Sequence, residues 1–251
     1  MAEKLPKDVP AIDVAGISKS FDSQLVLQDI DLNLAAGQIL CICGPNAAGK
    51  TTLLRIMAGL LQPTAGTVRI FGFDVQKQPQ RVKPILGAIF HKSMLYSQLT
   101  VIENLQFFAG LYGLRDSEAH IKELLEQVDL LPYRYDRAGI LSRGMLQRLA
   151  IARAMVHRPT VLLADEPFTG LDTDARKSLV EILKSFKGQG RAVVMTTHDV
   201  SLALQCCDRV AVLDKGKLIL TANVCQIDMD AFTKDYLLYA RENSCAASAI
   251  L

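Results

Sequence analysis

A glycine-framed loop between a strand-like and a helix-like segment constrains this chain more than any other feature. The loop reads GPNAAGKT and runs from residue 44 to residue 51. It follows the apolar run QILCIC and precedes LLRIMAGLL, which predict a short buried strand and a helix. Glycines let the backbone fold so that several N–H groups point inward, where the positive end of the helix adds to their effect. The sequence therefore predicts a site that holds a di- or triphosphate.

The side chains of this loop have distinct predicted roles. Lys50 supplies a full positive charge to the β- and γ-phosphates. The Thr51 hydroxyl is a hard oxygen ligand of the kind that Mg²⁺ prefers. Taken alone, the loop leaves kinases, GTPases and many ATPases open. The expected phosphate cradle comprises Gly44, Pro45, Asn46, Ala47, Ala48, Gly49, Lys50, Thr51 and Thr52.

The composition is that of a globular protein and does not call for a nucleic-acid partner. Of the 251 residues, 50% are hydrophobic and 22% are charged, which allows a sizeable core. The net charge of +2 is close to balanced. Six cysteines lack the histidine-containing spacings of a zinc site, so reduced thiols are expected. No apolar run approaches the roughly 20 residues of a transmembrane helix, so we do not expect the chain to span a membrane by itself.

The hydrophobic pattern predicts an α/β fold. Alternation over residues 11–43 predicts three strands, and continuous apolar runs at 160–165 and 191–198 predict buried parallel strands. Helical periodicity dominates residues 100–157. We expect a P-loop NTPase core of mostly parallel sheet, with an N-terminal antiparallel β subdomain and an α-helical insertion. The expected division of the single domain 1–251 is a core at 1–91 and 158–221, a helical subdomain at 92–157 and a tail at 222–251.

Two carboxylates end the apolar run VLLADEP at residues 161–167. At the carboxyl end of a parallel strand they would face the ligand crevice. Asp165 is expected to hold Mg²⁺ through its water shell, and Glu166 to orient or deprotonate the water that attacks the γ-phosphate. His198, in TTHD, ends another strand at the same edge and is a candidate γ-phosphate sensor. The predicted catalytic groups are therefore Glu166, His198 and Lys50.

Two further stretches lie on either side of VLLADEP. In LSRGMLQR, at residues 141–148, Ser142 is a good N-cap and Gly144 opens a helix, which together make a second anion site. TGLD follows at residues 169–172. Each of these stretches is a weak signal when it is read alone.

Together and in this order, GPNAAGKT, LSRGMLQR, LLADEP, TGLD and TTHD resemble the ATP-binding subunits of ABC transporters over residues 12–220. The resemblance implies that the chain binds ATP with Mg²⁺ and hydrolyses it to power transport. It implies separate transmembrane permease subunits as partners, and a peripheral position at the cytoplasmic face of the cell membrane. The cargo and the direction of transport are not encoded in this chain.

The resemblance also implies a dimer, either of two identical chains or with a similar ATPase. Ser142 and Gly144 of one chain would touch the γ-phosphate of ATP held by the other, and Asp172 would cross the same interface. Two copies would then enclose two ATP molecules in an isologous arrangement. Phe21 stands about where the family places an aromatic ring that stacks on adenine.

The sequence departs from the family pattern at two positions. The family usually has glutamine where His91 ends the strand GAIFH, so His91 either takes over a role near the metal or only shapes the loop that meets the membrane partner. Ala47 replaces a frequent glycine and is expected to be tolerated if its φ is negative. The stretches HKSMLYSQLT and ENLQFFAGLYGL resemble those of heme-exporter ATPases of cytochrome c maturation and their relatives.

Two other functional classes remain to be weighed. A soluble ABC-type ATPase of iron–sulfur cluster assembly would share the same motifs. Translation factors of this kind usually carry two ATP modules, and DNA-repair relatives carry long insertions, neither of which is present here. A phosphate-loop kinase of another family would have no use for Ser142 or Asp172.

Overall fold

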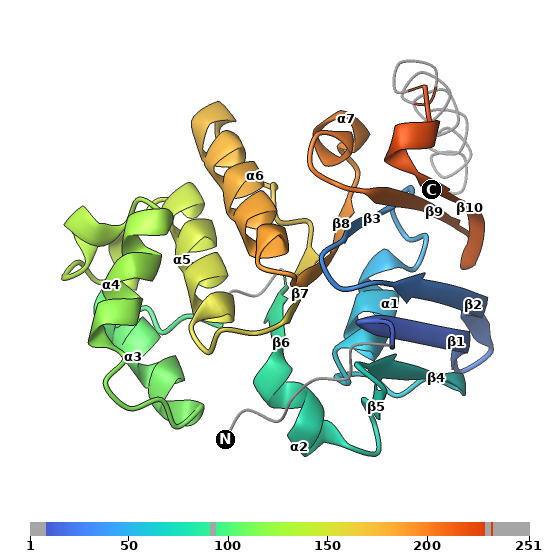
Figure 1. Ribbon diagram of the computed structural model, residues 1–251, viewed down its shortest axis with the longest axis horizontal. Helices are drawn as coiled ribbons and strands as arrows, with labels where there is room; N and C mark the ends of the chain where they lie inside the picture. Colours follow the sequence, from blue (N-terminus) through green and yellow to red (C-terminus); the bar gives the residue numbers. More distant parts are fainter. Residues whose placement is uncertain (1–8, 91–93, 229–231, 233–251) are drawn as a thin grey trace.

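A six-stranded sheet runs through the middle of the molecule (Figure 1). The computed structural model describes residues 9–90, 94–228 and 232. The strands, in spatial order, are β10 (Lys217–Asn223), β9 (Arg209–Asp214), β3 (Ile39–Cys43), β8 (Ala192–Thr197), β7 (Val161–Asp165) and β6 (Leu86–Ile89). β10 pairs antiparallel with β9, and the other neighbouring strands pair in parallel. The expected mostly parallel core is confirmed.

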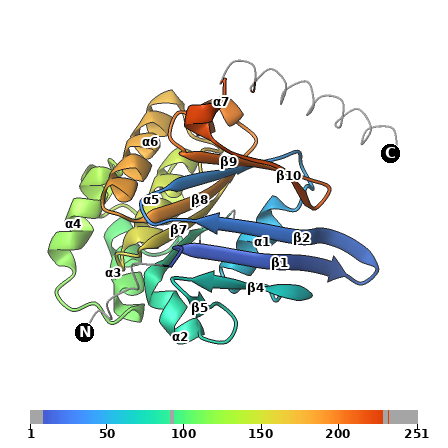
Figure 2. The same cartoon turned by 45° about the vertical axis from the view of Figure 1, so that its right-hand side comes forward.

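The N-terminal strands form a second, antiparallel sheet beside the first (Figure 2). Its strands, in spatial order, are β2 (Gln24–Leu34), β1 (Ile12–Phe21), β4 (Ala65–Ile70) and β5 (Phe73–Asp74). β1 and β2 are joined by a tight turn at 22–23, and β3 then leaves this sheet for the central one. The antiparallel N-terminal subdomain is therefore confirmed.

The helices lie on two sides of the central sheet, and a helical insertion separates β6 from β7 (Figure 1). The insertion contains α3 (Val101–Leu111), α4 (Glu118–Gln127) and α5 (Arg143–Met155). The other helices are α1 (Lys50–Met57), α2 (Pro79–Val82), α6 (Thr173–Gly188) and α7 (Val200–Leu204). Short 3₁₀ turns lie at Lys83–Ile85, Leu131–Tyr133, Ala138–Ile140 and Val224–Gln226.

The inner strands β3, β7, β8 and β9 of the central sheet are largely buried on both faces, and each face belongs to a different hydrophobic cluster. In β7, Leu162 and Ala164 pack with helices α3 to α7, whereas Val161 and Leu163 pack with α1 and the antiparallel sheet. The side chains of β3, β8 and β9 alternate between the clusters in the same way. Burial on both faces explains why these strands read as continuous apolar runs rather than alternating ones.

A buried asparagine fixes the loop that leads into the helical insertion. The predicted capping box of Thr100 and Glu103 is present at the start of α3. One position further on, Asn104 is fully buried. Its Oδ1 accepts from the N–H of Tyr96 at 2.8 Å, and its Nδ2 donates to the carbonyls of Tyr96 at 3.0 Å and Thr100 at 2.9 Å. A single side chain thus ties residues 96–100 to α3.

We predict that Asn104→Ala lowers the free energy of unfolding by about 2–3 kcal/mol, because it removes a fully buried side chain and the acceptor of the Tyr96 N–H. Urea unfolding followed by circular dichroism measures the change. Gln106→Ala, at an exposed position of the same helix, serves as the control and should change stability by less than about 0.5 kcal/mol. Equal stabilities of the two variants would contradict this role of Asn104.

Candidate nucleotide-binding site

The loop between β3 and α1 has a backbone that two glycines make possible. A Cβ on Gly44 would lie 2.2 Å from the carbonyl oxygen of Leu213 in β9. Gly49 has a φ of 105°, and a Cβ there would lie 2.8 Å from Cδ2 of Leu27. α1 begins directly after Gly49, so its first N–H groups have no carbonyl partner within the helix. The loop therefore has the backbone geometry of an anion-binding cup.

Ala47 does not meet the condition under which its methyl group was expected to be tolerated. A negative φ would have accommodated its methyl group, but the structure places Ala47 at a φ of 63°. In this left-handed region Cβ crowds the carbonyl oxygen, which costs roughly 1–2 kcal/mol. The family's glycine is therefore the less strained residue at this position.

The Lys50 side chain lies folded within the loop. It is buried, and its Nζ donates to the carbonyl oxygens of Gly44 at 2.7 Å and Pro45 at 3.0 Å. Burial lowers the pKa of Lys50, while the charges of Glu166 and Asp165 act in the opposite direction. The ammonium group is thus positioned where a bound polyphosphate would compete with the two carbonyl oxygens for it.

Asp165 connects three elements at the carboxyl edge of the sheet. The Thr51 hydroxyl, at the start of α1, donates to Oδ1 and Oδ2 of Asp165 at 3.1 and 2.9 Å. The Thr196 hydroxyl, in β8, donates to Oδ1 at 2.7 Å. Both Asp165 and Thr196 are buried. Their oxygens, with that of Thr51, are the hard donors that suit Mg²⁺.

Glu166 has an unusual backbone and a histidine partner. Its φ of 49° lies in the left-handed region, which is strained for a glutamate. The N–H of Glu166 lies within hydrogen-bond distance of Thr196, 3.0 Å from the hydroxyl and 3.2 Å from the carbonyl oxygen. Oε2 of Glu166 lies 2.8 Å from Nδ1 of His198. The strain coincides with the residue expected to handle the attacking water.

Five of the predicted site residues are therefore brought together, namely Lys50, Thr51, Asp165, Glu166 and His198. Thr196 was not among the predicted residues, although it holds both Asp165 and the backbone of Glu166. The sequence signal that could have indicated Thr196 is its position directly after the apolar residues AVVM of the predicted strand RAVVMTTH. A hydroxyl at a strand end is too common, however, to be chosen without the fold.

Ser142, Gly144 and Asp172 belong to the other side of the sheet. Ser142 caps α5 by accepting from the N–H of Met145 at 3.3 Å, and Asp172 caps α6 by accepting from the N–H of Ala175 at 2.8 Å. α5 and α6 pack within the cluster on one face, whereas α1 packs within the cluster on the other. Within residues 9–90, 94–228 and 232, no hydrogen bond joins Ser142 or Asp172 to the phosphate loop.

The LSRGM and TGLD stretches are in contact with each other. A Cβ added at Gly170 would lie 2.7 Å from Nε of Arg143, so the arginine lies directly against this glycine. The Nε2 of Gln147 donates to the carbonyl of Pro167 at 3.1 Å. These contacts fix the start of α5 on the loop that follows β7, and neither Arg143 nor Gln147 was predicted to do so.

Two predicted residues lie at the margins of the site. Phe21 ends β1 with 45% of its surface exposed, and the Nζ of Lys19 lies 4.9 Å from the centre of its ring. His91 lies outside the described residues, two positions after β6 ends. Both expected roles of His91, one near the metal and one in shaping the loop that meets the membrane partner, therefore stay predictions.

Comparison with known proteins identifies the family. The family model described as "ABC transporter" matches residues 27–169. The chain is 38% identical over 196 residues to the ABC transporter ATP-binding protein NatA of Bacillus subtilis (strain 168), a match that covers 77% of this chain and 80% of NatA. It is 37% identical over 213 residues to the Nod factor export ATP-binding protein I of Burkholderia lata, covering 84% of this chain and 70% of that protein.

Solved structures agree with this result. An ATP-binding subunit of an ABC transporter superposes with a TM-score of 0.83 and 26% identity, over 92% of this chain and 99% of that one. CbiO1 of Clostridium perfringens, part of the ABC transporter complex CbiONQ, superposes with a TM-score of 0.79 and 25% identity, over 92% of this chain and 93% of that one. The chain belongs to the ABC transporter family and is an ATP-binding subunit of such a transporter.

We predict that Ala47→Gly raises the free energy of unfolding by about 0.5–1 kcal/mol, since the relief of the left-handed strain exceeds the added entropy of the unfolded chain. Thermal unfolding without nucleotide measures the change. The neighbouring Ala48, which is buried and not at a positive φ, provides the control. Ala48→Gly should destabilise the protein, and a stabilisation of similar size at both positions would contradict the strain at Ala47.

Proposed function

We propose that this subunit hydrolyses ATP between two copies of the chain and uses dimer closure to drive separate transmembrane subunits. One observation carries the proposal. The helix that follows the phosphate loop and the helix capped by Ser142 pack against opposite faces of one sheet. A single chain therefore offers two halves of different sites, and a twofold partner completes both. A heterodimer with a similar ATPase would be completed in the same way.

Each chain supplies defined groups to the composite site. Lys50 and the N–H groups at the start of α1 hold the β- and γ-phosphates. Phe21 stacks on the adenine. Across the interface, Ser142 and Gly144 present a hydroxyl and an N–H to the γ-phosphate of the partner's ATP. Asp172 lies on that interface, at the end of the loop against which Arg143 packs.

Glu166 is the group that receives the proton of the attacking water. Oε2 of Glu166 lies 2.8 Å from Nδ1 of His198, and this hydrogen bond orients the carboxylate. Thr196 fixes the backbone of Glu166 through its hydroxyl. His198 lies at the same edge and is available to contact the γ-phosphate. Catalysis here depends on positioning and charge, as in other phosphoryl transfers.

Thr51 and Asp165 would hold Mg²⁺. Thr51 supplies a hydroxyl oxygen and Asp165 a carboxylate, and the two lie within hydrogen-bond distance of each other. When bound, Mg²⁺ supplies positive charge that offsets the charge of the phosphates. The carboxylate of Asp165 is buried, and it accepts hydrogen bonds from Thr196 in β8 and from Thr51 at the start of α1.

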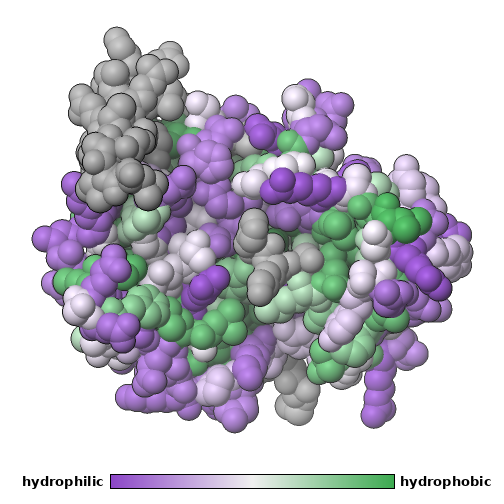
Figure 3. Space-filling model, turned by 180° about the vertical axis from the view of Figure 1, so that it is seen from behind, coloured by the Kyte–Doolittle hydropathy of each residue, from purple (hydrophilic) through white to green (hydrophobic). Residues whose placement is uncertain are grey.

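The permease subunits would dock on the start of the helical insertion, in the stretch from Phe90 to Gln106. Among the described residues, no helix is long and apolar enough to cross a membrane. Tyr96 and Phe107 have 49% and 40% of their surface exposed, and their ring centres lie 4.9 Å apart. Figure 3 shows hydrophobic side chains on both halves of the molecule's rear face, including the half that the helical insertion forms.

A partly buried arginine links α3, the helix in which this docking stretch ends, to the rest of the molecule. The guanidinium of Arg153, in α5, lies 5.2 Å from the ring centre of Phe108. It also donates to the carbonyl oxygen of Ala88, in β6, at 2.7 Å. A displacement of α3 by the partner would therefore be transmitted to α5, which carries Ser142, and to β6.

The cargo remains a matter of resemblance. The Nod factor export protein and NatA are similar to this chain. The stretches HKSMLYSQLT and ENLQFFAGLYGL also resemble those of heme-exporter ATPases of cytochrome c maturation. We propose a place at the cytoplasmic face of the membrane in each case, because ATP is supplied there. A soluble ATPase of iron–sulfur assembly is not favoured, because the matched relatives are ATP-binding proteins of transporters.

We predict that Glu166→Gln lowers the rate of ATP hydrolysis at least about 100-fold, because the amide cannot take the proton from water. Phosphate release measures the rate, and size-exclusion chromatography should still show ATP-dependent dimers. Lys50→Ala, in contrast, should lose nucleotide affinity itself. Hydrolysis by Glu166→Gln at close to the normal rate would show that the base is another group.

We predict that a photo-crosslinker at Phe107 captures a cytoplasmic loop of the transmembrane subunit in the intact complex. Phe107 is exposed, directly follows the docking stretch in α3, and its ring packs against that of Tyr96 within the stretch. The same crosslinker at Lys217, an exposed position at the start of β10 on the far edge of the central sheet, is the control and should capture less. Consistent absence of the Phe107 crosslink, while the complex co-purifies, would remove the docking proposal.

A further inference from the structure

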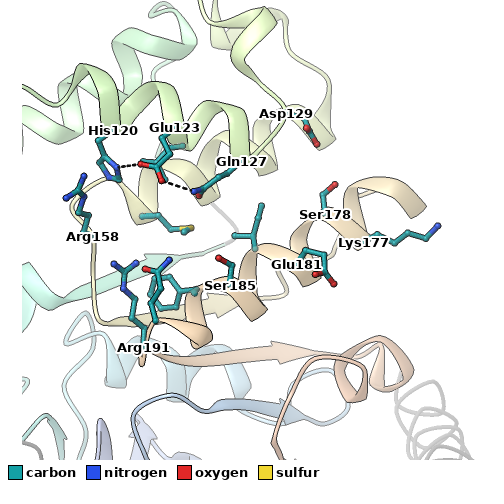
Figure 4. A pocket seen from close by; sticks show the side chains of 15 residues that line it. His120, Glu123, Gln127, Asp129, Arg158, Lys177, Ser178, Glu181, Ser185 and Arg191 are labelled. Carbon is teal, nitrogen blue, oxygen red and sulfur yellow. Dashed lines mark hydrogen bonds and ion pairs between the residues drawn. The ribbon is translucent and has the colours of Figure 1, made fainter.

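A cavity of about 710 Å³ opens between α4 of the helical insertion and α6 of the core (Figure 4). Residues just after α5 and just before β8 close one of its ends. None of its lining residues belongs to the phosphate loop, to the end of β7 or to the TTHD stretch. Its volume lies in the range that accommodates a drug-sized molecule. The cavity is therefore a second place where this chain could hold a ligand.

The cavity combines an apolar floor with polar walls. Leu124, Ile182 and Phe186 are buried at its base, on α4 and α6. The polar side chains on its walls include Gln127, Ser178, Ser185 and Gln189. A ligand with an apolar body would cover the floor, and its polar groups would meet the walls.

Two arginines stand together at one end of the cavity. Figure 4 shows Arg158 and Arg191 at the same end, away from Lys177 and Asp129. Among the described residues, no ion pair or hydrogen bond engages either guanidinium group; Arg191 only lies over the ring of Phe186, 5.0 Å from its centre. The chain thus places two guanidinium groups at one end of the cavity, and no carboxylate of the described residues pairs with either.

The charge of Arg158 lowers the pKa of two neighbouring groups, Arg191 and His120. Burial lowers the pKa of Arg191, and the charge of Arg158 lowers it further. Burial also lowers the pKa of His120, with a second contribution from Arg158, although Glu123 acts in the opposite direction. An anion placed beside Arg158 and Arg191 would relieve this repulsion.

The carboxylates that line the cavity have partners of their own. Glu181 lies 3.3 Å from the Nζ of Lys184, and Asp129 lies 3.6 Å from Arg148. Glu123 lies 3.7 Å from Nδ1 of His120. None of these acids neutralises the arginine end. Their charges along the rest of the cavity would repel a second anionic group, and so restrict the ligand to one such group at the arginine end.

We propose that this cavity binds an amphipathic organic anion, whose single carboxylate, sulfonate or phosphate lies between Arg158 and Arg191. Its apolar body covers Leu124, Ile182 and Phe186. Guanidinium groups favour such planar or tetrahedral oxyanions because they donate several hydrogen bonds in a fixed geometry. The ligand contacts α4 and α6 together, so it joins the helical insertion to the core. This inference does not depend on the proposed dimer.

The test uses 8-anilinonaphthalene-1-sulfonate, a fluorescent aromatic sulfonate, as the probe. The full chain is titrated in the presence of saturating ADP, which fills the phosphate loop. We expect saturable binding to the wild-type chain. Arg158→Gln and Arg191→Gln should each weaken binding at least about tenfold, because each removes charge-assisted hydrogen bonds to the sulfonate. Circular dichroism and thermal unfolding verify that each variant is folded.

Two further variants make the result specific to the cavity. Ser185→Glu, at an exposed wall position, adds a negative charge and should also weaken binding without threatening the fold. Lys177→Gln removes one positive charge at the other end of the cavity and should leave the affinity unchanged. The proposal fails if the wild type binds no probe under these conditions. It also fails if Arg158→Gln and Ser185→Glu bind like the wild type, or if Lys177→Gln is weakened equally.

Discussion

The hydrogen bonds to the buried carboxylate of Asp165 hold the nucleotide edge of this protein together. A buried charge is costly unless it is compensated, and here the hydroxyls of Thr51 and Thr196 provide the compensation. Because these three residues come from α1, β7 and β8, one carboxylate sets the relative positions of the phosphate loop and of both strands that end at the site. Thr196 then sets the backbone of Glu166 as well. The catalytic edge is therefore a connected unit rather than a set of independent side chains.

The alternation of side chains along the central strands has a functional effect beyond stability. It creates two hydrophobic clusters, one on each face of the sheet. The phosphate-binding helix is anchored to one cluster, and the helices capped by Ser142 and Asp172 are anchored to the other. In the proposed dimer, this separation assigns the two halves of each composite site to different chains.

Much of the fold and part of the site could be predicted from the sequence, because the relevant signals are local. The strand, glycine loop and helix around Lys50, the capping box at Thr100 and the two acids at the end of β7 all lie within short segments. The rest depends on tertiary contacts. The positive φ of Ala47 depends on how the loop closes, and the role of Thr196 depends on which strand lies beside β7. Arg158 and Arg191 are 33 positions apart in the sequence, and only the fold places them at one end of a cavity.

Arg153 has a consequence for how the protein would respond to its surroundings. Its guanidinium contacts a carbonyl oxygen and an aromatic ring, rather than an exposed carboxylate. Dissolved ions screen exposed charge pairs strongly and buried contacts much less. The coupling of α3 to α5 and β6 through this side chain should therefore vary little with ionic strength.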